Sequence, residues 1–205
     1  MTTIVDYGCG NLGSIQNMLK KLGEDSLITS DIELIDRAAR LILPGVGSFD
    51  TGMTNLKTHE LIPCLNRKVI DQGVPILGIC LGFQLMTNSS SEGCLEGLGW
   101  FDAETIKFDL SENKRKYPLP NIGWRKTNIN KDIPLYSELD DDTWFYYVHN
   151  YHVTTNDEKL ISLTSTYGHD YVAALSNENI LGVQFHPEKS HKYGLRLFSN
   201  FLNHY

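Results

Sequence analysis

The chain has 205 residues, of which 41% are hydrophobic and 21% charged, as is typical of a globular protein. A net charge of −7 and a pI near 5.4 argue against a nucleic-acid-binding or anionic-membrane-binding protein. No apolar run is long enough to span a bilayer, no signal-peptide pattern is present, and the cysteines at 9, 64, 80 and 94 form no C-x-x-C pair. We expect a cytoplasmic protein with a single domain over residues 1–205.

Strands and helices alternate along the first half of the chain. The expected order is strand 3–6, helix 11–22, strand 26–29, helix 32–38, strand 41–43, helix 54–72, strand 74–79 and helix 81–87. This alternation predicts the α/β class, with a mostly parallel open sheet and helices on both faces. A polar surface loop is expected at 109–118. Aromatic and β-branched runs within 144–154, 160–167, 171–176 and 180–187 predict additional C-terminal strands, followed by a helix at 194–202.

The first strand-to-helix junction carries a G-x-G-x-x-G pattern, formed by Gly8, Gly10 and Gly13. In dinucleotide-binding proteins this spacing cradles a pyrophosphate, and an acid such as Asp31 binds the ribose. The pattern alone is weakly specific, because a tight turn between a strand and a helix has the same composition.

A second glycine motif surrounds Cys80, where Gly78 and Gly82 flank it at the end of a buried strand. G-x-C-x-G is the thiol counterpart of the nucleophile elbow, in which a strained residue projects above the sheet at the start of a helix. A buried structural cysteine is the alternative, but the strand, the two glycines and the following helix together favour a nucleophile.

A nucleophilic cysteine needs a base, and His186 is the candidate. It lies at the end of the run 180–187, and Glu188 two residues later is able to orient its imidazole. Taken alone, His186 is as easily a structural histidine. His149 and His152 are equally compatible with structural strand positions or pocket lining. A nicotinamide enzyme would leave Cys80, His186 and Glu188 unexplained, so we favour a turn at Gly8–Gly13 and expect no cofactor and no metal.

Three motifs together resemble the class I glutamine amidotransferases: PGVGSF at 44–49, GICLGFQLM at 78–86 and GVQFHPEKS at 182–190. With DYGCGN at 6–11, NIGW at 121–124 and YYVHNY at 146–151, the full length is similar to the glutaminase subunits of imidazole glycerol phosphate synthases.

The resemblance implies that Cys80 attacks L-glutamine and releases ammonia through a thioester, with His186 transferring protons and Glu188 holding the imidazole. It also implies an oxyanion hole and a substrate-binding pair. Leu81, directly after the nucleophile, and the loop residues Val46 and Gly47 would supply the oxyanion donors. Gln84, one helical turn past Cys80, and Glu92 would bind the substrate glutamine.

The resemblance further implies a heterodimer with a (β/α)₈-barrel cyclase/synthase subunit, which would use the ammonia in histidine biosynthesis. The sequence itself offers no ATP loop and no acceptor pocket separate from the triad, so the acceptor enzyme should be another chain. By family position, the expected interface residues are Asn11, Trp124, Tyr147 and Lys189.

The NIGWR segment departs from the usual family pattern, which has His-Met before Gly-Trp and Asn after it, where this chain has Asn121, Ile122 and Arg125. PGVGSFDTGM at 44–53 and GLGW at 97–100 are also similar to a paralogous branch that supplies ammonia to a sugar amidotransferase for surface polysaccharides. That branch is one alternative function, and a stand-alone cysteine hydrolase or a non-enzymatic binding module is a remoter one.

Overall fold

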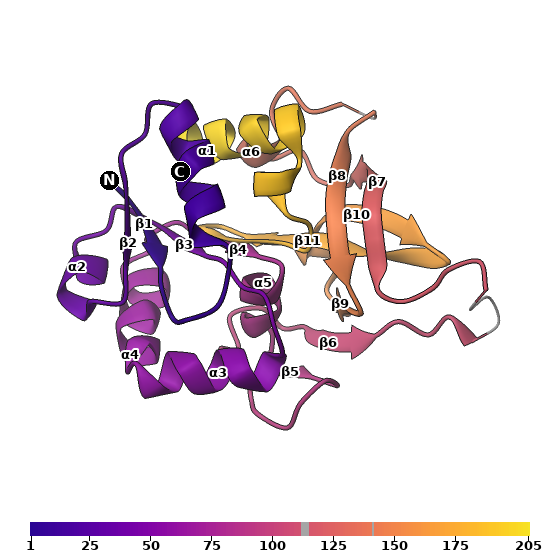
Figure 1. Cartoon of the computed structure of the whole chain (residues 1–205), viewed down its shortest axis with the longest axis horizontal. Helices are drawn as coiled ribbons and strands as arrows, with labels where there is room; N and C mark the ends of the chain where they lie inside the picture. Colours follow the sequence, from indigo (N-terminus) through magenta and orange to yellow (C-terminus); the bar gives the residue numbers. More distant parts are fainter. Residues whose placement is uncertain (112–114, 141) are drawn as a thin grey trace.

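The structure is a computed structural model that describes residues 1–111, 115–140 and 142–205; residues 112–114 of the expected 109–118 loop lie outside the described residues. One twisted sheet runs through the described chain in the order β2-β1-β3-β4-β12-β11-β10-β7-β8 (Figure 1). From β2 to β12 neighbouring strands are parallel. These strands are β1 (Thr2–Val5), β2 (Ser26–Thr29), β3 (Arg40–Leu43), β4 (Ile76–Ile79) and β12 (Ile180–Val183).

Beyond β12 the sheet becomes antiparallel. The strands there are β11 (His169–Asn177), β10 (Ile161–Tyr167), β7 (Asn121–Ile129) and β8 (Trp144–His149). A branch of β9 (Tyr151–Thr154), β6 (Glu104–Lys107) and β5 (Ser89–Ser90) joins β11. The predicted α/β class with additional C-terminal strands is confirmed, although the sheet as a whole is mixed. Strands β5, β6 and β7 are not among the predicted elements.

Helices cover both faces of the parallel part, as Figure 1 shows. They are α1 (Leu12–Lys21), α2 (Ile32–Asp36), α3 (Phe49–Thr58), α4 (Leu61–Asn66), α5 (Leu81–Leu85) and α6 (His191–His204). Successive residues of β3 alternate between the two cores: Leu41 and Leu43 pack with α3, α4 and α5, whereas Ile42 packs with α1 and α6. No helix in the described part of the chain is long and apolar enough to cross a membrane.

The predicted single helix at 54–72 is wrong, because the structure divides this region into α3, α4 and a π-helical turn at Arg67–Asp71. Helix α3 begins earlier than expected, since the Ser48 side chain accepts a hydrogen bond from the Thr51 amide and caps it. Glu60, in the left-handed conformation with φ 55°, then ends α3 and redirects the chain into α4.

The parallel arrangement brings several strand ends to one edge of the sheet. Tyr7 follows β1, Pro44 follows β3 and Cys80 follows β4. The buried Tyr7 hydroxyl donates a 2.6 Å hydrogen bond to the Pro44 carbonyl, so the loops after β1 and β3 are joined. Carboxyl-terminal edges of this kind are where open α/β sheets place their ligands.

Candidate active site

Cys80 occupies the tight turn between β4 and α5. Its backbone has φ 53° and ψ −109°, a strained conformation for a residue with a side chain. The two flanking glycines explain why the turn is possible. A Cβ on Gly82 would overlap the Leu43 carbonyl oxygen, and one on Gly78 would lie 2.6 Å from the Met86 methyl carbon. The structure therefore has the elbow geometry that the glycine spacing predicts.

We expect Gly82→Ala to lower the free energy of unfolding by about 3 kcal/mol or more, because backbone rather than a flexible side chain blocks the new methyl group. The matched control is Gly13→Ala, since each glycine is the second residue of its helix and Gly13 has open space around it. Denaturant unfolding should show Gly13→Ala unchanged or slightly stabilised. Equal stability of the two variants would contradict the close approach at the elbow.

His186 and Glu188 form a buried pair beyond β12. The imidazole Nδ1 lies 2.8 Å from Glu188 Oε1, and both side chains are 2% exposed. The other ring nitrogen, Nε2, is buried and has no hydrogen-bond partner among the described residues. Pro187–Lys189 forms a 3-10 turn, which brings Glu188 back under the ring. The pair is thus a histidine with one nitrogen oriented by a carboxylate and the other free to react.

The surroundings of His186 favour its protonated form. Burial lowers the pKa of His186, but the charge of Cys80 and the bond to Glu188 outweigh this effect and raise its pKa to about 10. No hydrogen bond of ordinary geometry joins Nε2 to the Cys80 sulfur, so Cys80 acts mainly through its charge. A protonated imidazole in turn stabilises a thiolate beside it.

Replacing Glu188 with glutamine is expected to lower the pKa of His186, because a neutral amide stabilises the imidazolium less than a carboxylate does. In the wild type the ring should remain protonated through neutral pH, and in Glu188→Gln it should lose its proton at lower pH. Titration of the His186 ring signals by NMR measures this shift. Glu178→Gln, on the exposed turn before β12, is the control, and an unchanged titration in Glu188→Gln would refute the pairing.

Ser190 fixes the backbone of this turn and is a residue that the sequence reasoning missed. Its hydroxyl donates to the His186 carbonyl at 2.7 Å and accepts from the Tyr146 amide at 3.0 Å. The His186 amide donates to the Tyr146 carbonyl at 2.8 Å, which closes a ring of bonds between β8 and the histidine. No motif spacing marks Ser190, because serine is common in turns.

A cavity of about 280 Å³ joins these groups. Seven predicted site residues line it: Val46, Gly47, Cys80, Leu81, Gln84, Glu92 and His186. Val148, His149, Asn150 and Tyr151 complete the wall. The volume suits a molecule smaller than most drug-sized ligands. Within the part of the chain that the structure describes, no group of three or more His, Cys, Asp and Glu side chains is arranged to hold a metal ion.

The two predicted substrate-binding residues, Gln84 and Glu92, already make hydrogen bonds within the protein. Glu92 accepts a 2.8 Å hydrogen bond from the Phe49 amide at the start of α3. Gln84 Nε2 donates to the Tyr151 carbonyl at 3.2 Å and to Gln184 Oε1 at 3.1 Å. Their positions at the cavity are therefore held in place before any ligand binds.

The loop after β3 forms one wall of the cavity, and its first residues are packed more tightly than Val46 and Gly47. Pro44 is held by Tyr7, and a Cβ on Gly45 would lie 2.8 Å from the Gly82 nitrogen. Farther along, Val46 is 48% exposed and Gly47 has φ 118° with open space around it. The first part of the loop is thus packed against α5, and the peptide after Val46 is not.

The predicted interface residues do not share one environment. Trp124 stacks on His191 with ring centroids 5.5 Å apart, and the exposed Lys189 lies over the ring of Tyr146 at 5.7 Å. Asn11 is exposed at the start of α1, which contacts the Pro187–Lys189 turn. Each is thus linked to the turn that follows His186: Lys189 belongs to it, α1 contacts it, and Trp124 stacks on the first residue of α6, which also contacts it.

Tyr147 is different, and the prediction that it contacts a partner is wrong. It is completely buried, and its hydroxyl lies 2.9 Å from Thr127 Oγ1. In β8 the side chains alternate, so Phe145, Tyr147 and His149 point into the core while Tyr146 and Val148 are only partly buried. Tyr146, its neighbour, instead contacts the predicted interface residues Trp124 and Lys189.

Two residues of the NIGWR segment that depart from the family pattern, Asn121 and Arg125, are joined by hydrogen bonds to each other and to His149. Asn121 is buried and its amide lies 2.9 Å from His149 Nε2, while Arg125 donates to Asn121 Oδ1 at 3.0 Å. Burial lowers the pKa of His149 to about 3, so its neutral ring donates from Nδ1 to the Tyr151 carbonyl and accepts from Asn121 at Nε2. His149 therefore lines the cavity as a neutral, fully bonded side chain.

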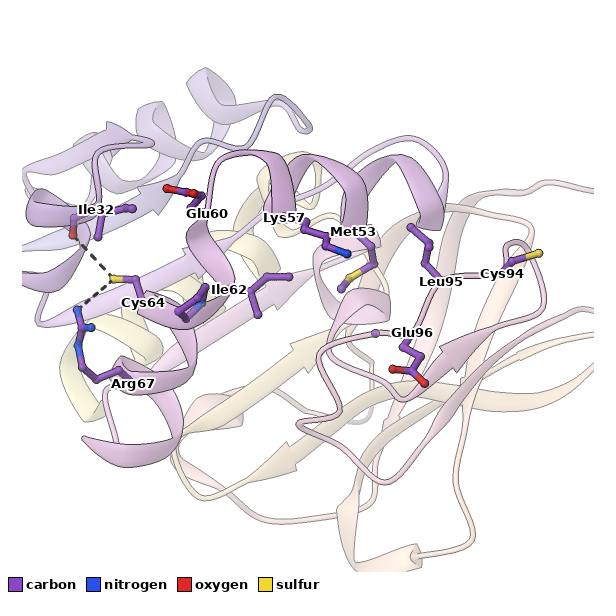
Figure 2. Close-up of a pocket in the computed structure, with 12 residues that line it drawn as sticks. Ile32, Met53, Lys57, Glu60, Ile62, Cys64, Arg67, Cys94, Leu95 and Glu96 are labelled. Atoms are coloured by element: carbon purple, nitrogen blue, oxygen red, sulfur yellow. Dashed lines mark hydrogen bonds between the residues drawn. The ribbon is translucent and has the colours of Figure 1, made fainter.

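A larger cavity, of about 880 Å³, lies elsewhere, among α2, α3, α4 and the loop at 94–97 (Figure 2). Cys64 lies at one end, hydrogen-bonded to the Ile32 carbonyl and to Arg67, and Cys94 lies at the other. Burial raises the pKa of the Cys64 thiol. None of its lining residues is a histidine that could pair with either cysteine, whereas Cys80 and His186 line the smaller cavity together, so we place the chemistry there.

The comparisons with known proteins agree with this geometry. The family model "Glutamine amidotransferase class-I" matches residues 3–205. The chain is 52% identical to imidazole glycerol phosphate synthase subunit HisH 2 of Methanococcus maripaludis and 41% identical to subunit HisH 1 of the same organism, each over 98% of both chains. A solved glutamine amidotransferase structure, 17% identical, superposes with a TM-score of 0.74 over 98% of this chain and 96% of that one, which supports the fold. The chain belongs to the class I glutamine amidotransferase family.

Proposed function

We propose that the chain hydrolyses L-glutamine to glutamate and ammonia through a thioester on Cys80. The observation that carries this proposal is that one small cavity is lined both by Cys80 in its strained elbow and by His186, whose ring is oriented by Glu188. The family assignment supports the same chemistry.

In the first half of the reaction, the Cys80 sulfur attacks the side-chain carbonyl carbon of glutamine. As the carbon–nitrogen bond breaks, protonated His186 gives its proton to the leaving nitrogen, and ammonia departs from a γ-glutamyl thioester. In the second half, His186 accepts a proton from water, which attacks the thioester. The carbon–sulfur bond then breaks, glutamate leaves and the thiolate is regenerated.

Both tetrahedral intermediates carry an oxyanion that needs donors. We assign one donor to the Leu81 amide, because the first amides of a helix have no partner within it. The second would come from Val46 or Gly47 in the neighbouring loop. Gln84 and Glu92 line the same cavity and would bind the α-amino end of the substrate, since each offers an acceptor oxygen there.

The ammonia is proposed to pass to a separate synthase subunit, a (β/α)₈ barrel that makes imidazole glycerol phosphate in histidine biosynthesis. The names of the relatives as subunits of imidazole glycerol phosphate synthase support this assignment. Asn11, Trp124 and Lys189 would face that partner, since each lies in or next to an element that contacts the Pro187–Lys189 turn or belongs to it.

One observation favours a second candidate, the paralogous glutaminase that supplies a sugar amidotransferase. The segment Asn121–Arg125, which departs from the usual family pattern, supports this alternative.

Reconstitution separates the two candidates. The chain is mixed with the cyclase subunit of an imidazole glycerol phosphate synthase from its own source, and glutamate and imidazole glycerol phosphate are both measured with glutamine as the nitrogen source. Formation of both products supports the first candidate. Complex formation only with a sugar amidotransferase supports the second, and no glutamate in any combination contradicts the glutaminase assignment.

A further inference from the structure

We propose that the side-chain amide of Gln184 donates a hydrogen bond to the Cys80 sulfur and stabilises its thiolate, a role that rests on the nucleophile assigned above. Gln184 directly follows β12 and is completely buried. Its Nε2 lies 3.7 Å from Cys80 Sγ, within the range of N–H···S hydrogen bonds. Because the contact is with the reacting atom itself, Gln184 is a catalytic residue in this proposal.

The neighbours of Gln184 determine which end of its amide faces the sulfur. Gln84 must turn its NH₂ group toward the Tyr151 carbonyl, since that carbonyl can only accept. The same NH₂ group donates to Gln184 Oε1 at 3.1 Å, so the Gln184 oxygen points to Gln84. The Gln184 NH₂ group then faces Cys80.

The chain of hydrogen bonds extends beyond Gln84. The Tyr151 carbonyl also accepts from His149 Nδ1 at 2.8 Å, and His149 Nε2 is bonded to Asn121 on β7. A continuous series of oriented bonds thus leads from β7 to the nucleophile. In this series Gln84 is a positioning residue, because it acts on the sulfur through Gln184.

The donor acts on one state of the sulfur more than on the others. A thiolate is a strong hydrogen-bond acceptor, whereas the sulfur of a thiol or a thioester is a weak one. The Gln184 bond therefore adds to the stabilisation that protonated His186 gives to the thiolate. It weakens when the sulfur bonds to carbon, so its main effect is on the pH range over which Cys80 is reactive.

The experiment measures the rate at which iodoacetamide alkylates Cys80 in the full chain as a function of pH. Peptide mass spectrometry separates Cys80 from the other cysteines. In Gln184→Met, which keeps the length but lacks a donor, the midpoint should rise by about one pH unit, as expected for one hydrogen bond to a charged group. In Gln184→Leu, a second apolar variant without a donor, the midpoint should rise by a similar amount.

A matched control and a second position sharpen the test. Gln16→Met removes a 3.0 Å side-chain bond to the Ser26 carbonyl and should leave the midpoint unchanged. Gln84→Met should shift it in the same direction as Gln184→Met but by less, because Gln184 loses only its orienting partner.

Thermal unfolding first establishes that both Gln184 variants are folded. If the pH midpoint of Cys80 alkylation is then unchanged in both, the proposal is overturned. The assay needs neither glutamine nor a partner, so it is independent of the proposed function. If wild-type Cys80 were alkylated no faster than the exposed Cys94 at neutral pH, the nucleophile assignment itself would fall.

Discussion

Replacing Cys80 with alanine is expected to reduce glutamine hydrolysis by at least about 10⁴-fold, because no other described cysteine has a histidine placed as His186 is. Removing the nucleophile leaves substrate binding and the oxyanion donors in place, but no thioester can form. Release of glutamate from glutamine by the reconstituted complex measures the loss.

The same variant should leave the complex able to use free ammonium, because the acceptor chemistry is assigned to the partner. Cys94→Ala is the matched control: Cys94 is exposed, and its variant should keep normal glutaminase activity. Glutaminase activity near the wild-type rate in Cys80→Ala would contradict the proposed mechanism, and loss of ammonium-dependent synthesis would show that the substitution disturbs the complex.

The elbow could be predicted from sequence because its requirement is local. A strained residue between a strand and a helix demands flanking residues without side chains, and Gly78 and Gly82 supply them. The pair of His186 and Glu188 was predicted from a spacing of two, which on a strand places both side chains on one side. In the structure β12 ends at Val183, and a 3-10 turn brings the two together instead.

Residues that act through long-range packing could not be predicted in this way. Gln184 and Ser190 carry no motif spacing, and their roles depend on β4, α5 and β8 meeting at one point. Tyr147 occupies an interface position in the family pattern. In the structure it has the same orientation as the buried Phe145 two residues earlier, so its side chain points into the core. The broken helix at 54–72 depended on a left-handed residue, Glu60, which no residue preference marks.

The isolated chain is expected to hydrolyse glutamine about 10²–10³-fold more slowly than the complex, the effect of one oxyanion donor. The Leu81 amide is fixed by the elbow, so the variable donor must come from the loop after β3. Pro44 and Gly45 are held against Tyr7 and α5, which leaves the peptide between Val46 and Gly47 free to rotate.

A peptide flip at this position has a specific backbone signature. Rotating the Val46–Gly47 peptide reverses its N–H and changes the φ of Gly47 from 118° to about −60°, a value open to any residue. A Cβ on Gly10 would lie 3.2 Å from the Pro44 ring, so the Gly8–Asn11 turn is in contact with the loop. A partner that binds at Asn11 could therefore shift the equilibrium between the two orientations.

Gly47→Ala tests this mechanism, because alanine disfavours the positive φ of the resting loop and should favour the flipped peptide. The basal glutaminase rate of the isolated chain should rise by up to about tenfold, and stimulation by the partner should fall. Gly23→Ala is the control: Gly23 also has a positive φ and open space, but it lies at the far end of α1. Steady-state glutamate release, with and without partner and acceptor ligand, measures both quantities. A wild-type chain as fast alone as in the complex would contradict gating, and a Gly47→Ala variant with unchanged basal rate would place the switch elsewhere.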